Sequence, residues 1–465
     1  MNDTIVKPGP APRRPIPLYV RVLIGVVSGA ALGAAVGTQP LSLGPLHLGK
    51  LEDLEKLGAL VIRLLKALAT PLILFAILDA FARTRISGKQ GLRMIGICLV
   101  NVSMAMILGL TLMNTLQPGL AWRGHLSELT AGVASETTLK SLPQHENVTL
   151  SPLENLSGYV PQSLVSPFLD NNVITIVLCA ILAGAALRSL KERQPGGGVH
   201  VLEQMIAAVL QILIQMLEWV IQAVPIAVFG VVAAVVARSG LGVFQKLWVF
   251  LAVMLLGLAI HSLIYYPLVA WVVGKKSPRE YVGKGADAIV TGLSTNSSLA
   301  TVPVTLRVLT ERMGVSQQSA RLAACVGTNL NNDGITLYEA MAALFLAQAV
   351  GYDLGLGQQF GVVLAALMAG IGIAGIPEAG LIVLPLVLGA AGLPESVVLT
   401  ALPLIMTVDW IIARCRSGVN VMSDMLVAIL LDALRPAGER PESLEDMAGE
   451  GDLAPEVAAI LEGNT

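Results

Sequence analysis

The chain has 465 residues, of which 54% are hydrophobic and only 13% are charged, and its formal net charge is -2. A soluble globular protein carries about 25% charged residues, so this composition excludes an ordinary soluble domain. No basic stripe is present to bind nucleic acid. The four cysteines lie singly inside apolar stretches, which excludes a disulfide framework and a paired-cysteine metal site.

Apolar stretches long enough to cross a bilayer recur along the chain. The first, near residues 18–37, has spanning length and no clear small-residue cleavage site, so we expect a membrane helix there and no cleavable signal peptide. Five further spans are predicted near 54–82, 90–116, 162–188, 200–236 and 245–273. These stretches predict a multi-pass integral membrane protein.

The distribution of Lys and Arg predicts its orientation. Basic residues gather before the first span, between the second and third, after the fourth and after the sixth, whereas the alternate connections have fewer. We therefore expect the tails 1–17 and 437–465 in the cytoplasm and the polar loop 119–160 outside the cell. The expected location is the cell membrane, a bacterial inner membrane in particular.

Two apolar segments of the second half, 282–310 and 358–392, are interrupted by turn residues. The first contains the polar run 294–298 followed by Pro303, and the second is rich in Gly and Pro between 370 and 380. Non-helical backbone at membrane depth survives only where protein or a water-filled cavity satisfies it. Paired interruptions are typical of an internally repeated transporter with a site at mid-membrane, so we expect two re-entrant hairpins. Two kinked spanning helices are the alternative.

The last span, 397–433, carries a polar stripe. Its members fall at i, i+4, i+7, i+11 and i+15, which is one face of a helix: Asp409, Ala413, Arg416, Asn420 and Asp424. A charge at the centre of a membrane helix costs about 2.5–3.5 kcal/mol, so it faces a cavity or a partner. Arg416 cannot lose its proton, and its planar guanidinium matches a carboxylate. We expect Arg416 to bind a carboxylate substrate. An internal ion pair with an acid such as Asp424 or Asp333 is the alternative, and the two states can alternate.

The helix before the second interruption, 318–350, supplies oxygen ligands. Asn331 and Asp333 precede Gly334, which weakens the helix and frees carbonyl groups in an environment suited to a small cation. Five acids of the second half face two bases: Asp333, Glu339, Glu378, Asp409 and Asp424 against Arg414 and Arg416. Uncompensated charge at low dielectric is too costly, so protons or bound cations must balance the excess. The residues therefore suggest cation coupling.

Four motifs resemble the glutamate-transporter family, also called the dicarboxylate/amino acid:cation symporters: STNSSLATVPVTLRV, TNLNNDGITLYEA, GIAGIPEAG and VDWIIARCRSGVNVMSD. With the preceding spans, the resemblance covers nearly the whole chain. It implies an all-α, inverted-repeat, elevator-type transporter over 18–436, with eight transmembrane helices and two re-entrant hairpins. It also implies a homotrimer in the lipid bilayer, with a scaffold of about 18–82 and 162–236. A transport domain of about 90–116 and 245–436 would move against that scaffold.

The same resemblance implies roles for single residues. Arg416 would grip the substrate carboxylate, and Asn420 would contact the backbone-like end of the substrate. The other substrate-binding positions would be Ser417, Ala413, Ile335, Ser297 and Ser298 of the first hairpin, and Gly375 and Ile376 of the second, gate-forming hairpin. One sodium site would comprise Asp424, Gly327, Asn331 and Asn420, and a deeper one would include Asn331, Asp333 and Asn101. Glu339 resembles a proton-carrying glutamate, and Glu378 is either a second proton carrier or a solvated gate residue.

Departures from the family pattern bear on the substrate and the ions. Ala413 replaces the aspartate that pairs with the amino group of an amino-acid substrate, and Ile335 replaces a threonine. Asn332 replaces a methionine that helps to form a gate-side sodium site. Around the deeper site, the third span offers Cys98, Asn101 and Val102 where a Tyr and a Thr/Ser pair are usual. These changes favour a substrate without an ammonium group and fewer coupled sodium ions.

We therefore expect a secondary active transporter that couples sodium or protons to symport of a small carboxylate, a C4 dicarboxylate first. An acidic or neutral amino acid is the alternative substrate, and an anion channel is the alternative of another class. No enzyme constellation is present, and no cofactor is expected beside the transported Na⁺ or H⁺. His261 is the only histidine inside a span, and a packing role is expected for it.

Overall fold

The computed structural model describes residues 18–38, 40–43, 46–83, 89–123, 161, 163–169, 172–193, 198–372 and 379–435. The tails, most of the 119–160 loop and the three gate positions Gly375, Ile376 and Glu378 lie outside these ranges. Within them, five helices are long and apolar enough to cross a membrane, judged by length and composition. The protein is thus a largely helical, multi-pass membrane protein.

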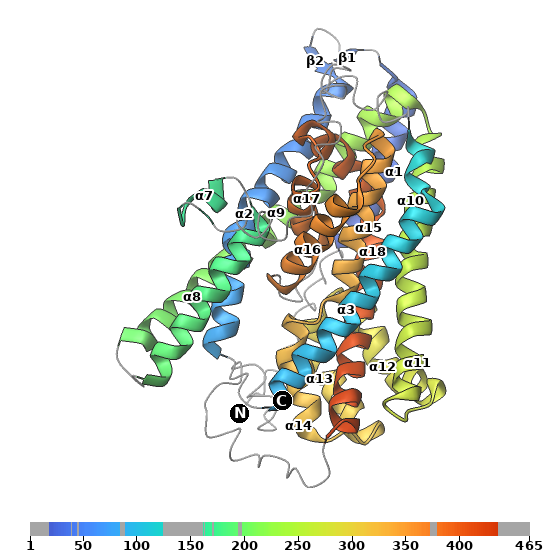
Figure 1. Cartoon of the computed structure of the whole chain (residues 1–465). Coiled ribbons are helices and arrows are strands. Elements are labelled where there is room, and N and C mark those ends of the chain that lie inside the picture. The colour runs from blue at the N-terminus through green and yellow to red at the C-terminus, as the bar shows by residue number, and fades with distance from the viewer. Residues whose placement is uncertain are drawn as a thin grey trace, which may run out of the picture.

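Each of the six predicted spans contains a helix, and the five after the first are the helices of spanning length (Figure 1). The helices of the six spans are α1 (Leu18–Val36), α2 (Glu55–Arg83), α3 (Lys89–Leu116), α8 (Val173–Arg193), α9 (Gly198–Ser239), and α10 (Val243–Ile260) continued by α11 (Tyr266–Val272). A π-helical turn, His261–Tyr265, joins α10 to α11. The fourth span starts later than the predicted residue 162, because Asn172 caps α8 by accepting a hydrogen bond from the Thr175 amide (3.3 Å).

Several short elements lie between the spans. An antiparallel hairpin of β1 (Pro40–Leu43) and β2 (Leu46–Lys50) follows α1, and it was not predicted. Alternating leucines around Gly44 and Pro45 provide the period-two pattern that favours such a hairpin. Two 3₁₀ turns, Leu51–Leu54 and Pro118–Trp122, and the short helix α7 (Ser166–Leu169) complete this half of the described chain.

The first interrupted segment forms a helical hairpin. Its arms α12 (Pro278–Thr295) and α13 (Ser298–Arg307) pack on each other, and a π-helical turn, Val308–Arg312, follows. At the tip, Asn296 takes a left-handed conformation (φ 55°), which an asparagine tolerates. Ser297 then caps α13 by accepting a hydrogen bond from the Ala300 amide (3.1 Å). The polar run 294–298 therefore contains the turn.

The remaining elements comprise a broken helix, a second hairpin and one long helix. The broken helix runs through α14 (Gln317–Arg321), a π-helical turn (Leu322–Val326) and a 3₁₀ turn (Gly327–Asn329) before α15 (Asp333–Val350). The arms of the second hairpin are α16 (Leu356–Gly372) and α17 (Ala379–Ala390), which also pack on each other. The last helix, α18 (Glu395–Ala433), carries the polar stripe.

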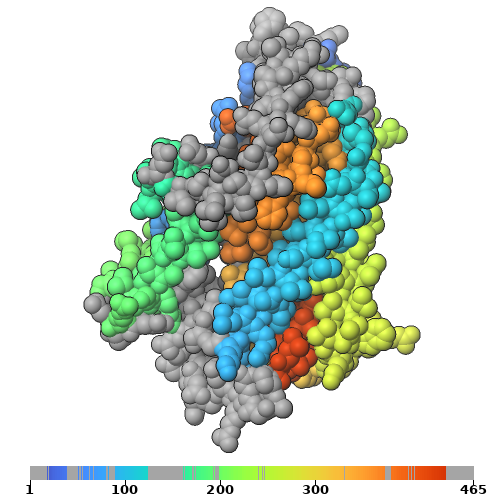
Figure 2. Space-filling model, viewed as in Figure 1, coloured from blue at the N-terminus to red at the C-terminus, as the bar shows by residue number. Residues whose placement is uncertain are grey.

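Two groups of helices can be distinguished by their contacts. In one group, α9 packs on α1 and α2, and α2 packs on α8. A stripe of glycines allows the close approach of α1, because a Cβ at Gly25, Gly29 or Gly33 would overlap a backbone carbonyl oxygen of α9. In the other group, α15 packs on α3 and α18, and α12 packs on α18. On the face in Figure 2, α3 crosses diagonally beside the orange surface of α16.

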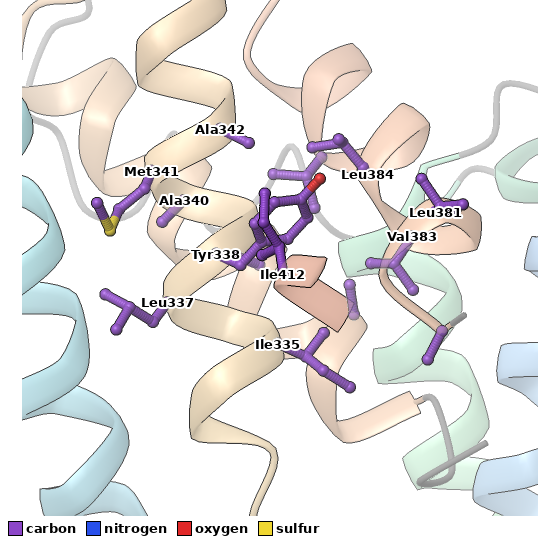
Figure 3. Packing of buried hydrophobic residues seen from close by; sticks show 14 of the residues in the cluster. Ile335, Leu337, Tyr338, Ala340, Met341, Ala342, Leu381, Val383, Leu384 and Ile412 are labelled. Carbon is purple, nitrogen blue, oxygen red and sulfur yellow. The ribbon is translucent and has the colours of Figure 1, made fainter. Parts of the chain in front are cut away.

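Helix α15 lies in the core of the second group. Nearly all of its residues are buried, as expected for a helix that is covered on every side. In Figure 3, Leu337 and Met341 point toward α3, and Leu381 and Leu384 approach from α17. The polar residues near the start of α15 are consequently deep inside the protein. The second hairpin also contacts α2 and α8, so it lies between the two groups.

Candidate functional site

The polar stripe of α18 faces the protein interior. Asp409 is 0% exposed, and Ala413, Arg416, Asn420 and Asp424 are each 2% exposed. The Nη2 atom of Arg416 donates a hydrogen bond to Oδ2 of Asp409 at 3.1 Å. Arg416 therefore forms an internal ion pair in this structure. The acid that pairs with Arg416 is Asp409, which belongs to the same stripe of α18. It is not Asp424 or Asp333, the acids that the sequence suggests.

The guanidinium of Arg416 is enclosed by aromatic and backbone groups. Its Cζ atom lies 4.1 Å from the centroid of the Tyr338 ring on α15, which is within cation–π range. The first turn of α17 covers it closely, since a Cβ at Gly380 would overlap the guanidinium. A glycine at this position thus allows the second hairpin to lie directly against the arginine.

The tip of the first hairpin reaches α18 beside this arginine. Ser417 donates from Oγ to Oδ1 of Asn296 at 3.1 Å. Ser297 and Ser298 start α13 and are 6% and 2% exposed. The hydroxyl of Ser298 has no hydrogen-bond partner among the described residues. Because the first turn of a helix presents unpaired N–H groups, this tip offers hydrogen-bond donors to an anion.

The start of α15 is joined to α18 by Asn420. Its Oδ1 atom accepts from the Gly334 amide at 2.9 Å, and its Nδ2 atom donates to Oδ1 of Asn332 at 3.0 Å. Ile335 is buried one residue further along, at 4% exposure. The start of α15, just after the break in the broken helix, therefore lies against α18 at Arg416 and Asn420, and Ile335 is next to this contact.

A second polar cluster lies at the break itself. Asn331 donates to Oδ1 of Asp424 at 3.2 Å and accepts from the Ser423 hydroxyl at 3.1 Å. The same hydroxyl lies 2.8 Å from Oδ2 of Asp333, so its single hydrogen is shared between the Asn331 and Asp333 oxygens. The carbonyl oxygen of Gly327 accepts from the amides of Leu330 and Asn331, each at 2.7 Å. Asp424, Asn331 and Asp333 are thus joined through one network of oxygen-bearing groups, which suits a small hard cation.

The π-helical turn His261–Tyr265 and the first residue of α11 contribute three residues that sequence patterns did not assign to the site. Tyr266 donates to Oδ2 of Asp333 at 2.9 Å, and Tyr265 donates to Oδ1 of Asn101 at 3.0 Å. The ring of His261 stacks on Tyr265, and its Nε2 atom lies 3.6 Å from Oδ2 of Asp333. The histidine does pack, as expected, but it packs against an acid of the polar cluster. Its neighbours Tyr265 and Tyr266, polar groups inside an apolar span, were the available signal.

Glu339 lies further along α15 in a different environment. It is 0% exposed, and neither carboxylate oxygen has a hydrogen-bond partner among the residues that the structure describes. Arg414 is only half-buried and donates to the Trp410 carbonyl on its own helix at 3.1 Å. The buried acids therefore differ in what stabilises their negative charge. Asp409 pairs with Arg416, and Asp333 accepts hydrogen bonds from neutral hydroxyl groups. Glu339 has no hydrogen bond and no ion pair among the described residues.

The arrangement has two chemical capacities. A buried guanidinium, an amide and two hairpin hydroxyls converge on a region that can bind a carboxylate, and the carboxylate and amide oxygens next to it can bind small cations. Among the described residues, no group of three His, Cys, Asp or Glu side chains is arranged to hold a metal ion. The cysteines Cys98, Cys179, Cys325 and Cys415 are free thiols.

Comparison with known proteins agrees with a transporter. The chain is 28% identical to excitatory amino acid transporter 3 of Mus musculus over 453 residues, covering 88% of this chain and 83% of the relative. It is 29% identical over 445 residues to an excitatory amino acid transporter of Caenorhabditis elegans, with 88% and 86% coverage. A similar relative from Onchocerca volvulus is 29% identical over 448 residues, with 88% of both chains covered.

A family model described as the sodium:dicarboxylate symporter family matches residues 18–434. That match extends from the first helix to the end of α18 and includes every contact of the two polar clusters. It confirms the resemblance inferred from the four motifs. Symport in this family is coupled to sodium, as its description states. The chain therefore belongs to the sodium:dicarboxylate symporter family.

Proposed function

We propose that this protein is a sodium-coupled symporter of an acidic amino acid. The observation that carries the proposal is the buried pair of Arg416 and Asp409, a cationic group with a replaceable internal anion. The names of the relatives, which are excitatory amino acid transporters, favour an amino acid over the C4 dicarboxylate expected from the sequence. An acidic amino acid is therefore the first candidate substrate, and a C4 dicarboxylate is the second.

A C4 dicarboxylate remains the second candidate because of one specific observation. Ala413 is buried at 2% exposure on the same stripe as Arg416, so this position offers no charge to an ammonium group. A buried charged group without a partner costs several kcal/mol, and an amino acid would need another acceptor for its ammonium. Arg416, Asn420, Ser417, Ser297 and Ser298 would bind either substrate in the same way.

The coupling to cations follows from charge balance. When a substrate carboxylate replaces Asp409 on Arg416, the site contains one more negative charge than before. A cation bound nearby offsets this charge at low dielectric, where an unbalanced charge is most costly. The network of Asp424, Asn331 and Asp333, with the Gly327 carbonyl, Asn420 and Asn101 beside it, supplies the oxygen ligands that we assign to sodium.

The elevator architecture is proposed on the division of the helices. The group of α1, α2, α8 and α9 would form the fixed scaffold of a homotrimer, and the group containing α3 and α10–α18 would move. The second hairpin supports this division, since α16 and α17 touch both α15 and the scaffold helices α2 and α8. The basic connections 83–93 and 275–284 support cytoplasmic termini.

The function is tested by a substrate panel in proteoliposomes. We expect labelled aspartate or glutamate to accumulate above its external concentration when an inward sodium gradient is imposed. Succinate uptake that exceeds aspartate uptake would select the second candidate. Dissipation of a substrate gradient without accumulation in either case would instead indicate an anion channel.

Proton coupling can be tested at Glu339. An ionised carboxylate that is fully buried without a hydrogen bond is strongly disfavoured, so we propose that this side chain carries a proton during transport. Replacing Glu339 with Gln is expected to remove the stimulation of uptake by an inward proton gradient while substrate exchange continues. The measurement compares net uptake and exchange at several external pH values. Unchanged stimulation by protons in the variant would assign the proton to another group.

A further inference from the structure

Asn332 connects the second hairpin to the polar stripe. It is the last residue before α15 and is 2% exposed. Its Oδ1 atom accepts from Nδ2 of Asn420 at 3.0 Å, and its own Nδ2 atom donates to the carbonyl oxygen of Gly370 at 2.9 Å. One side-chain amide thus spans from α18 to α16.

The carbonyl oxygen of Gly370 accepts its hydrogen bond from outside its own helix, from the Asn332 amide. Gly370 lies in the last described turn of α16. Gly370 is also buried, and the carboxyl end of a helix carries partial negative charge. Such a carbonyl must be satisfied by a donor or by a cation. Here the donor is the neutral amide of Asn332.

The surroundings hold this amide in place. The carbonyl oxygen of Asn332 accepts from the amide and the hydroxyl of Thr336, at 3.0 and 2.9 Å. Helix α16 also lies against the same turn, since a Cβ at Gly370 would overlap the Thr336 hydroxyl. The amide is therefore anchored on α15, with one hydrogen bond toward each of its two neighbours.

We propose that Asn332 is a positioning residue that latches the second hairpin to Asn420. Closure of the hairpin places the Gly370 carbonyl on the amide, and the same amide orients Asn420 beside Arg416. The neutral Asn332 amide donates to the Gly370 carbonyl, so the latch needs no cation at this point of α16. This inference rests on the proposed function, in which Asn420 contacts the substrate.

Two substitutions separate the latch from a general packing role. Asn332→Ala removes both hydrogen bonds, and we expect the apparent KM for substrate to rise about tenfold at every sodium concentration, with a smaller change in maximal rate. Asn332→Asp keeps an acceptor for Asn420 but turns a carboxylate toward the carbonyl end of α16. That all-oxygen environment requires a cation. For the Asn332→Asp variant, we expect the apparent KM for substrate to be raised at low sodium and to return toward the wild-type value at high sodium.

Asn114→Ala is the matched control. Asn114 and Gln359 exchange two side-chain hydrogen bonds, at 2.8 and 3.1 Å, and so tie the other end of α16 to α3 without touching Asn420. We expect its KM to stay within about twofold of wild type, because this contact lies away from the polar stripe. Equal effects of the alanine variants at 114 and 332, or an aspartate variant at 332 that sodium does not rescue, would overturn the latch.

A measurement without transport distinguishes failure of the latch from failure of the proposed function. A cysteine at Ala369, which is 0% exposed and adjacent to Gly370, reports opening of α16 in a chain whose four native cysteines are replaced by alanine. Asn332→Ala should increase its reaction rate with a water-soluble thiol reagent about tenfold in purified protein. An unchanged rate overturns the latch, whatever the substrate is. An increased rate supports it even if the substrate panel rejects an acidic amino acid.

Discussion

Replacing Arg416 with alanine is expected to reduce uptake of acidic substrates severely, with a loss of at least about thirtyfold. Truncating one partner of a buried, hydrogen-bonded charge pair costs about 2–5 kcal/mol, and each 1.4 kcal/mol is a factor of ten. Arg416 is buried beside Asp409 and Tyr338, so water cannot replace its guanidinium. The measurement is uptake of labelled aspartate and succinate by proteoliposomes under a sodium gradient.

Loss of uptake has a second possible origin, because the single substitution also leaves Asp409 as a buried, unpaired anion. The double variant, with alanine at both 409 and 416, removes this charge, and it should recover assembly and thermal stability without recovering uptake. Arg414→Ala is the matched control, since Arg414 lies two residues away, is only half-buried and bonds to its own helix. Undiminished uptake by the alanine variant at 416 would refute its role as the carboxylate-binding group.

Replacing Ala413 with aspartate is expected to shift substrate preference toward amino acids by about a hundredfold, which lies inside the range that a close buried charge pair gives. Position 413 lies on the same face of α18 as Arg416 and is 2% exposed, so a carboxylate there would be largely shielded from water. A close buried charge pair contributes about 1.5–7 kcal/mol to binding, which an ammonium group can use and a dicarboxylate cannot. The measurement is the ratio of kcat/KM for aspartate to that for succinate.

The neutral substitution Ala413→Asn controls for the size and polarity of the new side chain. It should move the ratio by no more than about tenfold, because a neutral hydrogen bond is weaker than an ion pair. If the asparagine and aspartate variants change the ratio equally, charge recognition at this position is rejected. If wild-type protein already prefers aspartate strongly, another group of the site must accept its ammonium.

Much of the fold could be predicted from local pattern. The first six spans follow from runs of apolar residues, and the turn at Asn296–Ser297 falls inside the polar run 294–298. The start of α15 at Asp333 is also local, since the preceding residues are polar and Gly334 follows directly. Helix α8 begins later than predicted because hydropathy does not register the capping asparagine that starts it. The strand pairing after α1 was missed for a similar reason: short leucine alternation is a weak signal inside a chain rich in leucine.

Part of the candidate site could also be predicted from local pattern. The period of a helix alone places Asp409, Arg416, Asn420 and Asp424 on one face, and charge counting alone indicates that protons or bound cations must balance the excess of acids. Local patterns along the chain are therefore sufficient to predict a membrane transporter with a buried guanidinium and an oxygen-rich neighbourhood.

The contacts between polar groups depend on how the helices pack. Arg416 pairs with Asp409, His261 and Tyr266 reach Asp333, and Asn332 bridges Asn420 to Gly370. Apart from the first, these contacts join residues on different elements, between 38 and 88 positions apart for the hydrogen bonds of Asn332. Periodicity describes the faces of one helix, whereas partners are selected by how helices pack and by which rotamers that packing allows. The partner of each polar side chain therefore depends on the packing of the whole helix bundle.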